Sequence, residues 1–136
     1  MSESFFDRHP LPPAPATLGW ELVQEWPEEG RIEIAFHPNA SMLNPRGSVQ
    51  GGFVAAMLDD TMGPALVSMT DGKEAPVTID MNVTFFRPVA PGRVIGRGRV
   101  ISRTSGTAFL EAELFDLSGN LLARSTSSAK IVPTGL

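Results

Sequence analysis

The sequence predicts an α+β fold in which an antiparallel sheet of five to six strands wraps one long central helix. The helix is predicted from residues 53–69, where eleven of 17 residues are apolar and do not gather on one face. The strands are predicted from segments with apolar side chains at alternate positions, bounded by short turns. A helix that is apolar nearly all round is buried nearly all round, so we expect the sheet to enclose it.

Two strands are predicted before the helix and four after it. Residues 19–26 and 30–37 are expected to pair around a turn at 27–30. The later strands are predicted at residues 77–85, 93–103, 107–117 and 121–132. Hairpin turns at 104–106 and 118–120 separate the last three. In 77–85 the apolar side chains occupy the odd positions, which predicts that they share one face of the sheet.

Prolines are expected to limit regular structure at two places. Pro64 lies inside the apolar stretch and is expected to kink or end the helix directly after Gly63. Residues 1–18 hold four of the 12 prolines, so we expect an arm without regular structure beyond a first short turn. Within it, residues 4–6 can dock as an anchor, and the alternative is a mobile arm. Residues 19–136 then form a single domain.

The composition excludes several chemistries. The chain has no Cys, which excludes disulfides, iron–sulfur clusters and a thiol nucleophile. Its two histidines, His9 and His37, are far apart, so a three-His metal site is impossible. We expect no metal and no cofactor, and a hydrolase of this composition would use a carboxylate as its acid or base. The net charge of −4 lacks the basic character of a nucleic-acid-binding protein.

Membrane and export signals are also absent from the sequence pattern. No apolar run reaches the roughly 18 residues that a membrane span needs. Residues 1–19 lack the positively charged start and the apolar core of a signal peptide. We therefore expect a cytoplasmic protein with no membrane partner.

Two adjacent carboxylates, Asp59 and Asp60, lie in the middle of the predicted helix. Burial there would raise the pKa of a carboxyl group and suit it to general-base work. Small residues at Ala55, Ala56 and Gly63 leave room for another group beside Asp59. The alternative is structural, with one Asp partly exposed and the other a buried hydrogen-bonding partner for a loop.

The loop at residues 44–52 runs directly into this helix. Gly51 and Gly52 would expose backbone N–H groups at the helix N-terminus, where the dipole favours an oxyanion, although a tight helix entry alone would also explain them. Gly51 and Asp59 are eight residues apart, about 12 Å along a helix. One helix cannot bring both to one carbonyl, whereas two antiparallel copies related by a twofold axis can. An active site here would be shared, and the protein would be at least a dimer.

These residues resemble a known family. The pattern Asn44-x-x-Gly47-x-x-Gln50-Gly51-Gly52, followed by Asp59 and residues 77–82, resembles the hotdog-fold acyl-CoA thioesterases of the phenylacetic-acid-degradation (PaaI) type. The resemblance covers residues 30–132 and implies a hotdog fold. It also implies dimers that join their sheets, often paired into homotetramers. The implied activity is hydrolysis of an aryl- or short- to medium-chain acyl-CoA to the free acid and CoA, with CoA present only as part of the substrate.

The resemblance gives the matching residues their expected roles. Gly51 would polarise the thioester carbonyl through its N–H, and Asp59 of the partner copy would act as nucleophile or general base. Asn44 and Thr78 would position the nucleophile or a water molecule. Asp60 is the reserve candidate for the catalytic carboxylate and is expected, with Gln50 and Gly52, to contact the substrate.

One departure from the family pattern bears on function. Gln50 stands where the family usually has His, and an amide can donate a hydrogen bond but cannot carry a proton. A non-catalytic acyl-CoA-binding hotdog module is therefore the alternative to a thioesterase. A hotdog dehydratase or hydratase is disfavoured, because it relies on an active His and neither histidine lies in the loop.

The phosphates of CoA call for a basic contact at the mouth of the site. Arg103 is the residue that we expect there, although any single basic residue also fits a solvated strand face. The chain offers further candidates at Arg46, Lys73, Arg87, Arg93, Arg97 and Arg99.

Overall fold

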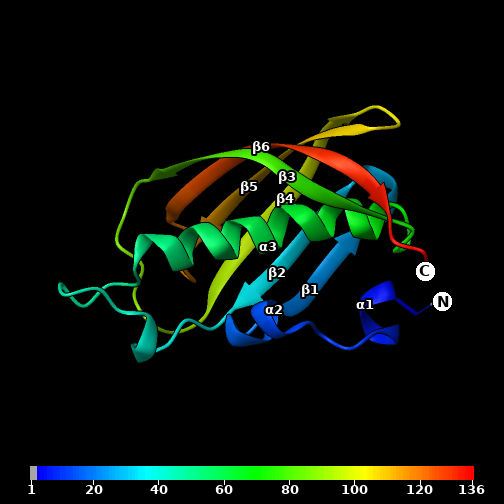
Figure 1. The fold of residues 1–136 in the computed structure, drawn as a ribbon. Helices are drawn as coiled ribbons and strands as arrows, with labels where there is room; N and C mark the ends of the chain where they lie inside the picture. The colour runs from blue at the N-terminus through cyan, green and yellow to red at the C-terminus, as the bar shows by residue number, and fades with distance from the viewer. Residues whose placement is uncertain (1–2) are drawn as a thin grey trace.

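The computed structural model describes residues 3–136 (Figure 1). Two short helices, α1 (Phe5–Arg8) and α2 (Pro13–Thr17), precede the strands β1 (Glu21–Trp26) and β2 (Arg31–Phe36). The long helix α3 (Gly51–Met69) follows, and then come β3 (Glu74–Phe85), β4 (Val94–Arg103), β5 (Thr107–Phe115) and β6 (Leu121–Pro133). Two strands, one long helix and four strands therefore occur in the predicted order.

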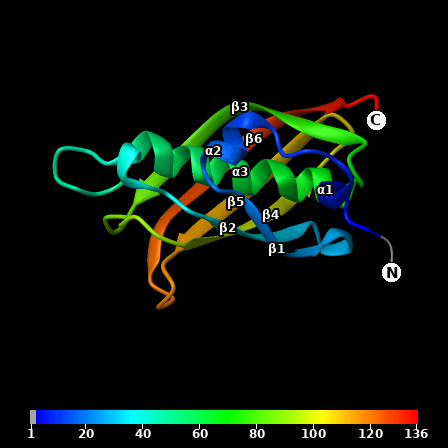
Figure 2. The same cartoon turned by 90° about the horizontal axis from the view of Figure 1, so that it is seen from below.

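The six strands form one antiparallel sheet in the order β1-β2-β4-β5-β6-β3. The sheet curves around α3, which lies across its concave face (Figures 1 and 2). This arrangement confirms the α+β fold with a central helix that the sequence predicts. No helix in residues 3–136 is long and apolar enough to cross a membrane.

Helix α3 has buried side chains from its first turn to its last, as its apolar sequence predicts. Its fully buried side chains include Met57, Leu58 and Leu66. Two glycines of β4, Gly96 and Gly98, allow the helix to approach the sheet closely, because a side chain at either position would collide with Thr61 of the helix. The backbones of α3 and β4 therefore lie in close contact, which fixes the position of the helix against the middle of the sheet.

The helix continues through Pro64 to Met69, so the expectation that it ends after Gly63 is not met. Proline has no N–H to donate to the carbonyl four residues earlier, which here belongs to Asp60. The indole Nε1 of Trp20 donates to that carbonyl oxygen instead, at 2.9 Å. A side chain 40 residues away thus supplies the hydrogen bond that Pro64 removes, and the helix is continuous.

Strand β3 lies at the edge of the sheet and carries a β-bulge between Thr78 and Asp80. The extra residue reverses which side chains face the helix. Before the bulge, Thr78 faces α3, and after it Met81 and Val83 pack against the core. The prediction that all the odd-numbered apolar side chains share one face is therefore wrong for Val77 and Ile79, which are 53% and 66% exposed.

The N-terminal arm, residues 4–18, is docked on the rest of the molecule. The ring of Phe6 packs against that of Trp20, with centroids 5.1 Å apart, and Phe5 lies directly over Gly72. Residues 4–6 thus act as an anchor, which was one of the two alternatives. The predicted arm also includes residues 1–2, which lie outside the described residues.

Helix α2 in this arm contradicts the expectation of no regular structure after a first turn. Its prolines occupy the N-cap (Pro12) and the first turn (Pro13 and Pro15). Residues of the first turn have no intrahelical acceptor for their N–H groups, so proline is tolerated there. The density of prolines therefore marks the start of a helix in this case.

The Trp20 indole can be tested by a double-mutant cycle with Pro64. We expect Trp20→Phe to lower the free energy of unfolding by about 1–2 kcal/mol, because it leaves the Asp60 carbonyl without a donor. In a Pro64→Ala background the residue at 64 has its own N–H, so the same change should cost about 1 kcal/mol less. Urea unfolding of the four proteins measures this coupling. Equal costs in both backgrounds would show that the indole does not replace the missing helix bond.

Candidate active site

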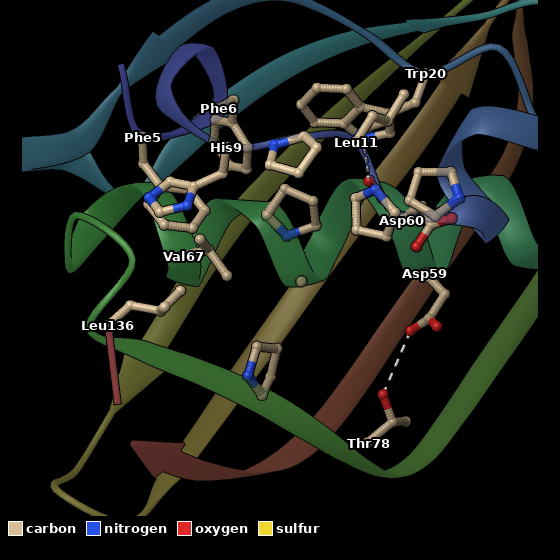
Figure 3. Close-up of a pocket in the computed structure, with 16 residues that line it drawn as sticks. Phe5, Phe6, His9, Leu11, Trp20, Asp59, Asp60, Val67, Thr78 and Leu136 are labelled. Carbon is tan, nitrogen blue, oxygen red and sulfur yellow. Dashed lines mark hydrogen bonds between the residues drawn. The ribbon is translucent and has the colours of Figure 1, made fainter. Parts of the chain in front are cut away.

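The two carboxylates of α3 open into one cavity, about 510 Å³ in volume. Asp59 and Asp60 lie at one end of it, while Val67 and Leu136 lie at the other (Figure 3). The cavity runs along the outward side of α3, between the N-terminal arm and the start of β3. A ligand group of moderate size can therefore reach both carboxylates.

Asp59 is exposed and accepts a hydrogen bond from Thr78 of β3. The Thr78 Oγ1 donates to Asp59 Oδ1 at 3.3 Å (Figure 3). The β3 bulge described above is what turns the hydroxyl toward the helix. One carboxylate oxygen of Asp59 is thereby oriented, and the other is available to a ligand or a water molecule.

Asp60 differs from its neighbour because it is more buried. Burial, with a smaller contribution from the negative charge of Asp59, raises the pKa of Asp60 to about 6. Its carboxyl group can therefore hold or release a proton close to neutral pH. The two adjacent acids thus have different environments, as expected for side chains about 100° apart on a helix.

The loop before α3 is closed by its own asparagine. The Asn44 Oδ1 accepts from the backbone N–H groups of Arg46 and Ser48, and its Nδ2 donates to Ser48 Oγ at 3.0 Å. Asn44 is therefore engaged inside its own loop, where it holds Arg46 at an exposed tip.

The N-terminus of α3 presents two free amides. Gln50 is the N-cap residue, but its side chain makes no capping hydrogen bond. Within residues 3–136, the N–H groups of Gly51 and Gly52 donate to no acceptor, whereas that of Phe53 donates to the Gln50 carbonyl. The ring of Phe85 covers Gly51, and Gly52 is open to solvent. These amides, with the helix dipole behind them, can bind a negatively charged oxygen.

A second groove, about 770 Å³ in volume, lies at this end of α3. Asn44, Gly51 and Phe85 line it together with Arg46 and Arg87. Neither arginine forms a salt bridge to another described residue. The groove thus combines backbone donors with two positive charges that are available to a ligand.

The other arginines that the sequence offers are engaged with carboxylates. Arg103, the residue expected to contact phosphate, pairs with Glu74 at 2.8 Å, and its Nε donates to the Thr104 carbonyl. Three more pairs are formed by Arg93 with Glu21, Arg97 with Glu33, and Arg99 with Glu111.

The structure therefore divides the predicted site residues into two sets. Asp59, Asp60 and Thr78 line the first cavity, while Asn44 and Gly51 line the second groove, beside Gln50 and Gly52. Arg103 lines neither of them. Gly51 and Asp59 are separated by about 12 Å along one continuous helix. No group of three metal-ligating side chains is found in residues 3–136.

This combination of fold and site matches known proteins. The family profile described as "Thioesterase superfamily" matches residues 46–123, which include both carboxylates and the loop from Arg46 onward. The chain belongs to the thioesterase superfamily. The resemblance to PaaI-type hotdog thioesterases is thereby confirmed, and with it the prediction of a thioester hydrolase.

Individual proteins are similar to this chain in sequence, in fold or in both. A predicted thioesterase related to phenylacetic acid degradation, from Ralstonia eutropha JMP134, is 33% identical with a TM-score of 0.83, and the match covers 93% of this chain and 95% of that one. A predicted esterase from Thermoplasma acidophilum is 30% identical over 77% of this chain and 79% of its own length. A Streptococcus mutans protein bound to acetyl-CoA shares the fold at 16% identity, with a TM-score of 0.74 and coverage of 84% and 89%.

Sequence reasoning about this superfamily member missed the wall of the first cavity. The arm contributes Phe5, Phe6 and His9, and Trp20 follows it directly. His9 stacks on Phe5, with ring centroids 4.2 Å apart, so one histidine does line the cavity that holds the carboxylates. The aromatic pair at residues 5–6, already predicted as part of an anchor, was the available signal.

The raised pKa of Asp60 predicts how stability depends on pH. The folded-state pKa of about 6 exceeds the unfolded value of 3.8, so the folded protein binds this proton more tightly. The contribution of Asp60 to the free energy of unfolding therefore falls as pH rises from about 4 to about 6. Asp60→Asn removes this loss and should stabilise the protein by about 1–2 kcal/mol at about pH 7.5, a range reduced for partial solvent exposure.

Urea unfolding at about pH 4 and about pH 7.5, at one protein concentration, measures this difference. The exposed Asp7→Asn on α1 is the matched control and should show no such dependence. A variant at position 60 that is as stable as the wild type at the higher pH would contradict the assigned pKa.

Proposed function

We propose that this protein hydrolyses acyl-CoA thioesters, with Asp59 as the catalytic carboxylate and the Gly51 amide as the oxyanion donor. The observation that carries the proposal is the Asp59–Thr78 pair, an oriented and exposed carboxylate at the mouth of a cavity that can hold an acyl group. The Streptococcus mutans protein of the same fold, which binds acetyl-CoA, supports this substrate class.

The distance between the two sets of residues supports a site shared by two copies. A thioester carbonyl must lie about 3 Å from both its oxyanion donor and its nucleophile or base. Gly51 and Asp59 of one chain are too far apart for this, whereas Gly51 of one copy can face Asp59 of a second, antiparallel copy. A homodimer is then the smallest active unit, and pairing of dimers into a tetramer is compatible with it.

The edge of the sheet offers the surface for such a dimer. Strand β3 is 12 residues long, and one of its two edges pairs with β6 while the other faces outward. Val77, Ile79 and Phe85 on this strand are more than half exposed. A long, apolar edge strand is a ready surface for pairing with another strand, and Thr78 on it would then lie close to the shared site.

The chemistry can follow one of two routes from the same carboxylate. As a nucleophile, Asp59 attacks the carbonyl carbon, the C–S bond breaks, CoA leaves as a thiolate that takes up a proton, and water hydrolyses the resulting anhydride. As a general base, Asp59 takes a proton from water as the water oxygen adds to the carbonyl, and collapse of the tetrahedral intermediate expels CoA. In both routes the Gly51 N–H stabilises the negative charge that develops on the carbonyl oxygen.

The remaining site residues are proposed to assist the substrate. Asn44 keeps the loop closed, and Gln50 and Gly52 border the carbonyl site. Arg46 and Arg87 are better suited to the CoA phosphates than Arg103, whose guanidinium would have to leave Glu74 first. The reaction as proposed needs no metal and no cofactor apart from the CoA of the substrate.

One observation favours a second function, the binding of acyl-CoA without turnover. Gln50 cannot carry a proton, so a mechanism that needs a charged group at this position would fail here. In the mechanism above Asp59 attacks the carbonyl or takes up the proton, so a charged group at position 50 is not needed. An assay of CoA release from acyl-CoA thioesters separates the two functions.

Asp59→Asn tests the catalytic carboxylate. The amide keeps the shape of the side chain but can neither attack a carbonyl nor take up a proton, so kcat/KM should fall by about 10²–10⁴-fold. Release of free CoA from a panel of acyl-CoA thioesters measures it. Asp60→Asn is the matched control one residue away and should retain more activity. Equal rates for wild type and Asp59→Asn would contradict the assignment, and CoA binding without turnover by the wild type would favour the binding module.

Gly51 allows the amide to be removed with little other change. Gly51 is the first helical residue, a position where proline is favoured, and the backbone of Gln50 (φ −60°, ψ 141°) suits a residue that precedes proline. Gly51→Pro should therefore lower kcat by about 10²–10³-fold through loss of the N–H. Gly51→Ala brings a similar contact with Phe85 but keeps the N–H, and it should lose far less.

Mixing the two inactive proteins tests whether the site is shared. A mixed dimer of Asp59→Asn and Gly51→Pro contains one site with both wild-type residues. Random exchange of subunits should restore about a quarter of wild-type activity, since half of the dimers are mixed and one of their two sites is intact. A site built within one chain would give no recovery.

A further inference from the structure

We propose that the cavity beside Asp59 is a length gauge for the acyl group, with Gly63 at its midpoint and the N-terminal arm as its far wall. The substrates that it fits are apolar acyl groups of medium length. This inference rests on the proposed thioesterase function and adds the part of the substrate that the site selects.

One face of α3 forms the floor of the cavity. Asp59, Gly63 and Val67 follow one another at intervals of four residues, so they lie along the same side of the helix. All three line the cavity, and Figure 3 shows Asp59 near one end of it and Val67 towards the other. An acyl chain attached to a carbonyl beside Asp59 can therefore run along the helix over Gly63.

The arm and the C-terminus close the other sides. Phe6, Leu11 and Trp20 line the cavity together with Pro76 of β3, and Leu136 borders its far end. The lining is mostly apolar and rich in aromatic rings and prolines, which have few rotamers and keep their shape. Such a wall fits an apolar chain or ring.

The arm is held in place by contacts at its start. The ring of Phe5 lies directly over Gly72, where a side chain would collide with the ring and where the φ of +78° also favours glycine. Arg8 pairs with Asp71 in the same turn, between α3 and β3, at 2.7 Å. These two contacts fix the position of the far wall relative to the helix.

The length of the cavity sets the length of the acyl group. From Asp59 to Val67 the helix rises about 12 Å. An extended chain advances about 1.2 Å per bond, since three backbone bonds span at most about 3.6 Å. The cavity therefore accommodates an extended acyl chain of about ten carbons, and its volume of about 510 Å³ is within the usual range for ligand pockets.

Gly63 determines whether the far half of the cavity can be reached. It has no side chain, and a Cβ there would meet only Pro76, at 3.5 Å, which is an ordinary van der Waals distance. A longer side chain at this position must therefore extend into the cavity. Leucine also favours the helix over glycine by about 1 kcal/mol, so the substitution is compatible with folding.

Gly63→Leu tests the gauge directly. The kcat/KM ratio of decanoyl-CoA to acetyl-CoA should fall about tenfold or more relative to wild type, because the leucine occupies the space that the distal carbons need. Gly63→Ala adds a single methyl group and should give a smaller fall in the same ratio. Melting temperatures of both variants establish that they are folded.

A second pair of variants tests the arm. Phe5→Ala removes a ring from the far end, so the preferred chain should become longer, with lauroyl-CoA gaining relative to decanoyl-CoA. Asp7→Ala changes an exposed side chain of the same helix that does not line the cavity, and its profile should equal that of wild type.

The outcomes separate the inference from the proposed function. If wild type releases CoA but the ratio is unchanged in Gly63→Leu, the length gauge is overturned and the thioesterase proposal stands. If wild type hydrolyses none of these acyl-CoA thioesters, the proposed function fails and the inference fails with it. A fall in the ratio for Gly63→Leu, graded through Gly63→Ala, supports both.

Discussion

The architecture depends on covering a helix that is apolar on all sides. The sheet can cover only one side of α3, and Phe6 of the N-terminal arm and the adjoining Trp20 cover much of the other. Every polar group on such a helix must find a partner or open into a cavity. Asp59 and Asp60 open into a cavity. The candidate catalytic carboxylates therefore lie where the sheet, the helix and the arm leave a gap.

The continuity of the same helix keeps the free amides at its N-terminus apart from the carboxylates at its middle. Close packing on Gly96 and Gly98 and the Trp20 bond at Pro64 keep α3 continuous. Its free amides and its carboxylates therefore cannot approach each other by bending. This rigidity is the physical argument for a site built from two copies, since a second helix can bring together what one helix holds apart.

Local sequence patterns predicted the long helix and the strands of this fold. Contacts between residues far apart in the sequence determine the features that those patterns did not predict. Helix α3 and the succession of strands along the chain follow from periodicity, and Asp59 stands out because a carboxylate is costly on an apolar helix. The passage of α3 through Pro64 depends on Trp20, 40 residues away, and the arm became part of the cavity through Phe5 and His9. Tertiary partners of this kind leave no periodic trace in the sequence.

The β3 bulge affects what a related chain inherits at this site. Before the extra residue, even-numbered side chains face the helix, and after it odd-numbered ones do. A homologue that keeps a hydroxyl at the position of Thr78 but lacks the extra residue would turn that hydroxyl away from the carboxylate, or move the following hydrophobic side chains out of the core. Matching letters in an alignment are thus not enough to transfer the pair between Thr78 and Asp59. The homologue must also keep the bulge, which sets which side chains of the strand face the helix.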